Sequence, residues 1–94
     1  MYAYVMDQPG ATMDLYRAVR QEVGEDAPPG LIVHAVGLHD DGVPVIDVWE
    51  SKGDCDRFDN ERFYPAQERA FAKVGSPPGM PVLVELDVQA FMRP

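Results

Sequence analysis

A histidine, an aspartate and a tryptophan lie close together in the sequence, in a stretch that is otherwise mostly apolar. His34, Asp47 and Trp49 all belong to residues 30–51, which also hold the second histidine, His39. An imidazole held by a carboxylate is a good general base for removing a phenolic proton or a proton next to a carbonyl group. An indole is a flat wall against which an aromatic ligand can lie. These residue types therefore indicate proton transfer on a flat ligand.

The same residues also have structural interpretations. Buried polar groups must satisfy each other, so His34 and Asp47 equally suit a structural hydrogen-bonded pair. If the site is catalytic, Asp47 is interpreted as the residue that orients the imidazole. His39 falls in a predicted turn and is interpreted as a solvated surface residue. Cys55 is interpreted as a packing residue, because no base has a clear sequence relation to it.

Residues 30–51 are predicted to form a β-hairpin. Two arms rich in Val, Ile and Leu flank Asp40-Asp41-Gly42. Asp-Gly between β-branched residues is a strong hairpin signal, because Gly readily takes the positive φ of a tight turn. Since strand residues alternate between faces, His34, Asp47 and Trp49 are predicted to share one face of the hairpin.

Two registers of this hairpin are compatible with the sequence. A four-residue loop would place His34 opposite Asp47. It would also place Ile32 opposite Trp49. A two-residue loop would instead place His34 opposite Trp49 and Val36 opposite Asp47. Either register keeps the imidazole and the carboxylate on the same side of the sheet.

The other elements follow from hydrophobic periodicity and turn residues. Strands are predicted at residues 2–8 and 82–88. A helix is predicted at residues 13–23, with Thr12 as its N-cap and Gly24 as its stop. Its apolar residues at helical spacing are Leu15, Tyr16, Val19 and Val23. A further helix follows Ser51, with Asp54, Asp56, Asp59 and Glu61 interpreted mostly as its solvated face. Pro65 is predicted to begin a separate segment, residues 65–74, because proline is accepted at a first helical position.

The resulting order, β-α-β-β-α-β, predicts a ferredoxin-like α+β fold. Right-handed crossovers give a four-stranded antiparallel sheet of order 4-1-3-2 with both helices on one face. The other face is expected to carry a largely apolar set that needs cover: Tyr2, Tyr4, Met6, Ile32, His34, Val36, Val45, Asp47 and Trp49. An exposed patch of this kind usually marks an interface or a ligand groove. We therefore expect a homodimer that forms through this open sheet face and encloses an apolar cavity.

Composition narrows the classes of function. The 94 residues suit a single domain, 1–94. Acidic residues outnumber basic ones sixteen to eight, which argues against nucleic acid and anionic membranes as partners. Cys55 is the only cysteine, so no disulfide within the chain and no cysteine-based metal site is expected. No apolar run approaches about 18 residues, and the chain is expected to be soluble and cytoplasmic.

These features together resemble a known superfamily. The β-α-β-β-α-β order, the segment Val-Ile-Asp-Val-Trp-Glu-Ser at residues 45–51 and the pattern of Phe58, Arg62 and Pro65-Ala66 are similar to the dimeric α/β-barrel superfamily. The similarity is nearest to its small bacterial members related to antibiotic-biosynthesis monooxygenases. It implies a dimeric α/β barrel and a choice among monooxygenases, haem-degrading enzymes, isomerases, dehydratases, cyclases and stress-associated proteins. Fold alone does not choose among these reactions.

The favoured hypothesis is an enzyme without cofactor or metal that acts on a flat apolar molecule, aromatic or polyketide-like. The reaction is monooxygenation, cyclisation or isomerisation, with His34 and Asp47 as catalytic residues. The remaining residues of the expected face form the ligand-binding walls: Trp49, Tyr4, Tyr2, Met6, Ile32, Val36 and Val45. The alternative is a non-catalytic dimer that binds a small ligand or acts under stress, and haem binding is a third hypothesis.

Overall fold

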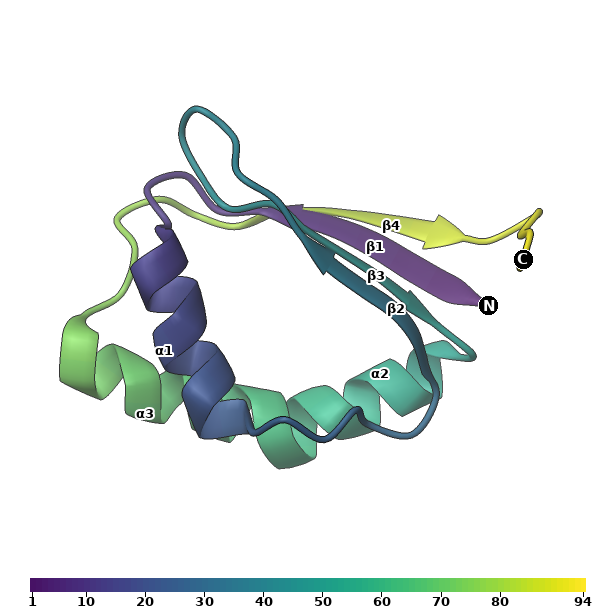
Figure 1. Ribbon diagram of the computed structural model, residues 1–94, viewed down its shortest axis with the longest axis horizontal. Coiled ribbons are helices and arrows are strands. Elements are labelled where there is room, and N and C mark those ends of the chain that lie inside the picture. The colour runs from purple at the N-terminus through teal and green to yellow at the C-terminus, as the bar shows by residue number, and fades with distance from the viewer.

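A computed structural model describes residues 1–94 and confirms the predicted α+β architecture. The elements are β1 (Tyr2–Asp7), α1 (Met13–Val23), β2 (Leu31–Val36), β3 (Val45–Trp49), α2 (Lys52–Phe58), a π-helical turn (Asp59–Phe63), α3 (Tyr64–Val74) and β4 (Val82–Asp87). The antiparallel sheet has the order β2-β3-β1-β4, which is the predicted order read from the other edge. All helices lie on one side of the sheet (Figure 1). None of them has the length and apolar character needed to cross a membrane.

Helix α1 begins and ends where its flanking residues predict. The hydroxyl of Thr12 accepts a hydrogen bond from the backbone N–H of Leu15 at 3.1 Å, which satisfies one of the free amides of the first turn. Gly24 follows the helix with a φ of 95°, a backbone conformation that a side chain would disfavour. Glu22 bridges α1 to α3 through ion pairs with Arg69 and Lys73.

The second helical region is continuous where a break was predicted at Pro65. The π-helical turn joins α2 to α3, and the Tyr64 N–H donates to the carbonyl of Asp59, one residue further back than in an α-helix. Pro65 then lies in the first turn of α3, where a backbone N–H would have no hydrogen-bond partner within that helix. The prediction of a new segment here was correct within one residue, but the chain stays helical across the junction.

The hairpin adopts the register of the four-residue loop. His34 lies opposite Asp47, and the backbone pairing continues to a bridge between His39 and Gly42. A bulge between Leu31 and Val33 places Leu31 opposite Trp49, so the prediction of Ile32 at that position was wrong.

Gly42 serves the hairpin in a way that the turn pattern did not predict. Its φ is not positive, contrary to the expectation for an Asp-Gly turn. A Cβ atom at this position would lie 2.6 Å from Asp7 Oδ1 and 3.0 Å from the carbonyl oxygen of Gln8. Glycine is required here because the hairpin passes close to the end of β1.

The predicted roles of the two sheet faces are reversed in the structure. Trp49 is only 1% exposed, and its ring centroid lies 5.5 Å from that of Phe58 in α2. The face that carries His34 and Asp47 therefore points toward the helices. The opposite face is the open one, with exposed side chains from all four strands: Val5, Val33, Ile46, Val82, Val84 and Leu86. Both faces are rich in apolar residues, so alternation alone could not decide which one the helices cover.

Candidate functional site

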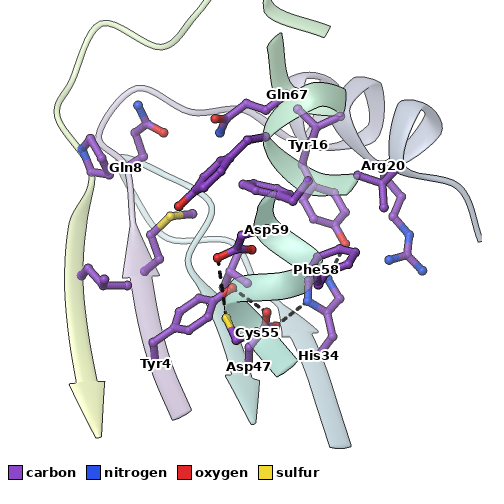
Figure 2. Close-up of a pocket in the computed structure, with 18 of the residues that line it drawn as sticks. Tyr4, Gln8, Tyr16, Arg20, His34, Asp47, Cys55, Phe58, Asp59 and Gln67 are labelled. Atoms are coloured by element: carbon purple, nitrogen blue, oxygen red, sulfur yellow. Dashed lines mark hydrogen bonds and ion pairs between the residues drawn. The ribbon is translucent and has the colours of Figure 1, made fainter. Parts of the chain in front are cut away.

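A cavity of about 460 Å³ lies between the sheet and the helices of one chain. Most of the residues expected to line a cavity between two subunits line this cavity, which a single subunit builds. Its walls are mainly apolar and aromatic, and α1, α3 and β4 contribute side chains such as Leu15, Val19, Phe71 and Leu83. A volume of this size suits a small organic molecule. Figure 2 shows the cavity, with polar side chains entering both from the strands and from the helices.

Four side chains form an unbroken chain of hydrogen bonds along the cavity wall. The Tyr16 hydroxyl lies 2.7 Å from His34 Nε2, and His34 Nδ1 lies 2.6 Å from Asp47 Oδ1. The Tyr4 hydroxyl donates to Asp47 Oδ2 at 2.6 Å. The chain runs from α1 through β2 and β3 to β1, and Figure 2 traces it. The antiparallel pairing of β2 with β3 and of β3 with β1 puts these three strand residues side by side.

The chemistry of the four groups assigns their protons. A carboxylate only accepts hydrogen bonds, so Nδ1 of His34 must carry the proton that Asp47 receives. In a neutral imidazole Nε2 then has a lone pair and accepts from the Tyr16 hydroxyl. Asp47, which is 4% exposed, accepts from both His34 and Tyr4. The arrangement holds the imidazole in one tautomer, with its basic nitrogen toward Tyr16.

Tyr4 and Tyr16, the two tyrosines of this chain of hydrogen bonds, stay protonated at neutral pH. Burial raises the pKa of Tyr4 far above its ordinary value, and the charge of Asp47 and the hydrogen bond to it add to the effect. Burial also raises the pKa of Tyr16. The positive charge of Arg20 opposes that rise. The phenols therefore act as hydrogen-bond donors in the resting state.

A second polar pair faces the cavity from the helical side. Cys55, in α2, is 2% exposed, and its Sγ lies 3.6 Å from Oδ2 of Asp59 in the π-helical turn. Burial, followed by the charge of Asp59, raises the pKa of Cys55 to about 12, so the residue is a thiol rather than a reactive thiolate. Burial also raises the pKa of Asp59. The prediction that Asp59 lies on the solvated face of the helix was wrong.

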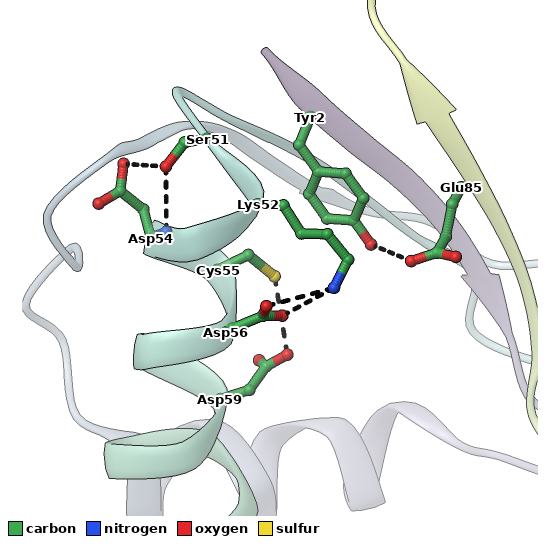
Figure 3. Close-up of polar contacts among 8 residues, drawn as sticks. All are labelled: Tyr2, Ser51, Lys52, Asp54, Cys55, Asp56, Asp59 and Glu85. Carbon is green, nitrogen blue, oxygen red and sulfur yellow. Dashed lines mark hydrogen bonds and ion pairs between the residues drawn. The ribbon is translucent and has the colours of Figure 1, made fainter.

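Polar residues also surround one edge of the cavity, where β1 and β4 approach α2. The Tyr2 hydroxyl donates to Glu85 at 2.7 Å, and Lys52 pairs with Asp56 at 3.1 Å. The Lys52 ammonium also lies 5.6 Å from the centre of the Tyr2 ring. Figure 3 shows these contacts, which link the edge of the sheet to the start of α2.

Most of the residues predicted for the site line this cavity. Seven of them do so: His34, Asp47, Trp49, Tyr4, Tyr2, Met6 and Val45. Ile32 and Val36 do not, and the bulge in β2 brings Leu31 to the wall in place of Ile32. The Trp49 Nε1–H is buried and has no hydrogen-bond partner within the protein.

Sequence reasoning missed two polar members of the site. Tyr16 was interpreted only as part of the apolar stripe of its helix, although it is the one phenol on that stripe. Asp59 was grouped with the acidic residues around it, although it lies four residues after Cys55 and therefore on the same face of the helix. No group of three or more His, Cys, Asp or Glu side chains lies close enough to hold a metal ion.

Comparison with known proteins identifies the fold. No family model and no curated protein matches the sequence. An antibiotic biosynthesis monooxygenase superposes with a TM-score of 0.68 at 13% identity over 96% of this chain and 100% of its own. A variant of SnoaB, a cofactor-independent oxygenase from Streptomyces nogalater, superposes with a TM-score of 0.67 at 10% identity over 97% of this chain and 95% of its own. The monooxygenase from the gene ActVA-Orf6 of Streptomyces coelicolor, in complex with nanaomycin D, superposes with a TM-score of 0.65 at 19% identity over 99% of this chain and 91% of its own.

Proposed function

We propose that this chain, which has the ferredoxin-like fold of antibiotic biosynthesis monooxygenases, is a small enzyme that works without a cofactor on a flat, largely apolar molecule. The substrate is aromatic or polyketide-like. His34 is the proton acceptor, Asp47 holds it, and Trp49, Tyr4 and Tyr2 form walls. The observation that carries the proposal is the continuous hydrogen-bond chain through His34 in a mainly apolar cavity.

Proton transfer follows from this arrangement. Asp47 fixes the tautomer of His34, so Nε2 is the nitrogen that gains a proton. The imidazolium that forms lies against the buried carboxylate of Asp47, which stabilises its charge. Removal of a phenolic or enolic proton leaves the substrate as an electron-rich anion. The low polarity of the walls strengthens these electrostatic interactions relative to water.

Three reactions can begin from such an anion. Isomerisation and cyclisation require the proton to be removed and a proton to be returned elsewhere. Monooxygenation adds dioxygen as a second substrate. Oxidation of a CH₂ group to a carbonyl places one oxygen atom in the product and releases the other as water. The similarity in fold to a cofactor-independent oxygenase and to a monooxygenase in complex with nanaomycin D supports this third reaction.

The open sheet face supports the second part of the proposal, a homodimer. Side chains on this face include Ile46, which is 47% exposed, and Val84, which is 54% exposed. Removal of apolar surface of this kind from water is favourable, so covering the four strands would stabilise the protein. A second copy packed sheet to sheet covers it and leaves each cavity within its own subunit.

A panel of flat hydroxyaromatics and cyclic 1,3-diketones tests the enzymatic function. Each compound is incubated with the protein, products are identified by mass spectrometry, and oxygen uptake is recorded with an electrode. Turnover that His34→Ala abolishes, with folding retained by circular dichroism, supports the proposal. Mass spectrometry of compounds that co-purify with the protein supplies candidates beyond the panel. Turnover that survives in His34→Ala contradicts the assigned base.

The second candidate function is non-catalytic binding of a small ligand by the same dimer. It is favoured by the internal satisfaction of the polar chain, in which Asp47 already accepts two hydrogen bonds. Under this alternative His34→Ala chiefly lowers the melting temperature, and no compound of the panel is turned over. Haem, the third hypothesis, is tested by adding it to the purified protein and recording whether a Soret band of bound haem develops.

A further inference from the structure

The basic nitrogen of His34 is covered by the hydroxyl of Tyr16. Their 2.7 Å contact uses the only lone pair that the imidazole has available, and the two rings are nearly parallel, with an interplanar angle of 12° and centroids 6.0 Å apart. A ligand in the cavity therefore approaches His34 through Tyr16. The phenol oxygen retains acceptor capacity when it donates to Nε2, and Tyr16 lines the cavity.

A cation without a partner lies on the same helix, one turn further along. Arg20 lines the cavity but forms no ion pair and no side-chain hydrogen bond, in contrast to Arg17, which pairs with Asp14. Residues four apart on a helix are neighbours on its surface. Burial and the charges of Asp47 and Glu25 raise the pKa of the Tyr16 phenol, and the charge of Arg20 is the one contribution that favours its ionised form. Negative charge that develops on an atom next to the Tyr16 hydroxyl is stabilised by the same field.

We propose that Tyr16 is the catalytic residue that contacts the substrate, that His34 acts through it, and that Arg20 stabilises the substrate anion. The substrate O–H bond breaks as its proton moves to the Tyr16 oxygen. The Tyr16 O–H bond breaks in the same step, and its proton forms the N–H bond at His34 Nε2. Tyr16 ends neutral, His34 ends as an imidazolium held by Asp47, and the substrate ends as a phenolate or enolate beside Arg20. This inference rests on the proposed function, because it names the atom of that site which meets the substrate.

The inference also narrows the class of substrate. The other charged side chains that line the cavity are Lys52, which is paired with Asp56, and the carboxylates of Asp26, Asp47, Asp56, Asp59 and Glu85. A negative charge on a ligand is disfavoured near these carboxylates and favoured at the Arg20 end. We therefore expect an acidic hydroxyl, either a phenol or an enol, at the end of the flat molecule that enters beside α1.

Ionisation of a bound chromophore tests this step without any turnover. The probe is 7-hydroxycoumarin, a flat phenol whose neutral and ionised forms absorb at different wavelengths. It is added to the protein at a pH below its own pKa in water. The wild type is expected to bind the probe partly as the anion. Tyr16→Phe is expected to bind it in the neutral form only, and Arg20→Gln with a smaller anionic fraction than the wild type. Arg17→Gln is the matched control and is expected to behave as the wild type does.

One further variant keeps the outcomes distinct. His34→Gln retains an acceptor for the Tyr16 hydroxyl but removes the base, so it is also expected to bind only neutral probe. Anion that persists in Tyr16→Phe but disappears in His34→Gln overturns the inference and leaves His34 as the direct base of the proposed function. Absence of bound anion in the wild type also overturns the inference. The proposed function is judged separately, by turnover of the substrate panel.

Discussion

The hydroxyl of Tyr16 and the Nε2 atom of His34 lie 2.7 Å apart and connect helix α1 to the edge strand β2 across the cavity. Asp47 holds the other nitrogen of the same imidazole at 2.6 Å. The three residues form a row of phenol, imidazole and carboxylate. Asp47 accepts the Nδ1 proton of His34, and His34 Nε2 accepts the hydroxyl proton of Tyr16.

Asp47→Asn is expected to reverse the tautomer of His34 in part of the molecules. An amide can donate to Nδ1, and the proton of the imidazole then lies on Nε2, where it can no longer accept from Tyr16. Turnover of any substrate found should fall by roughly 10²-fold or more, the usual contribution of general base catalysis. The ¹⁵N chemical shifts of the His34 ring report the tautomer. A variant with an unchanged tautomer and unchanged turnover would show that Asp47 does not orient the base.

Tyr4→Phe is expected to destabilise the fold by about 1–3 kcal/mol, because it leaves a buried carboxylate oxygen without its donor. Urea denaturation at neutral pH measures the change in the free energy of unfolding. Tyr2→Phe is the matched control, since its hydroxyl donates to Glu85 in an exposed contact and its removal should cost less. Equal losses in the two variants would contradict the burial of the Asp47 contact.

Asp59→Asn is expected to raise the free energy of unfolding relative to the wild type, and to do so more at pH 7 than at pH 4. Burial raises the pKa of Asp59 in the folded state above its unfolded value, so its favourable contribution is present at low pH and is lost as the pH rises through the folded pKa. An amide of the same shape has no such pH dependence and can still accept from the thiol of Cys55. Unfolding by urea at both pH values measures the difference. Asp56→Asn, at an exposed residue paired with Lys52, is the control.

The dimer is tested on the open sheet face. Ile46→Lys is expected to yield monomers, because a charge replaces an apolar side chain at the centre of that face. Light scattering after size-exclusion chromatography gives the molar mass. Val74→Lys, at an exposed apolar residue that ends α3 on the other side of the molecule, should leave the dimer intact. A wild-type protein that is monomeric at micromolar concentration would refute the proposed assembly.

The order of the elements could be predicted because each carries a local signal. Thr12 and Gly24 mark the ends of α1, and the Asp-rich turn between two apolar arms marks the hairpin. The direction in which the sheet faces could not be predicted in this way, because β3 alternates Val45, Asp47 and Trp49 with the equally apolar Ile46 and Val48. The burial of Trp49 against Phe58 decides it, and that contact is tertiary.

The candidate site was predictable only in its strand residues. His34 and Asp47 share a face in either hairpin register, so their proximity depends on local pairing. Tyr16 reaches them from a helix separated by a loop, and the angle at which α1 crosses the sheet sets that contact. Ile32 was wrongly predicted to lie opposite Trp49, because a bulge of one residue shifts the alternation of side chains along the strand. No residue type in this part of β2 indicates the bulge.

The most direct test of the central claim is the protonation state of His34 when a ligand is bound. Protein labelled with ¹⁵N-histidine is titrated with 7-hydroxycoumarin, and the spectrum of His39→Gln assigns the signals because His39 is the only other histidine. We expect Nε2 of His34 to move to the chemical shift of an imidazolium on binding, and to remain that of a neutral ring in Tyr16→Phe with bound probe. A neutral His34 in the wild-type complex would contradict the claim that this imidazole takes the proton of the ligand.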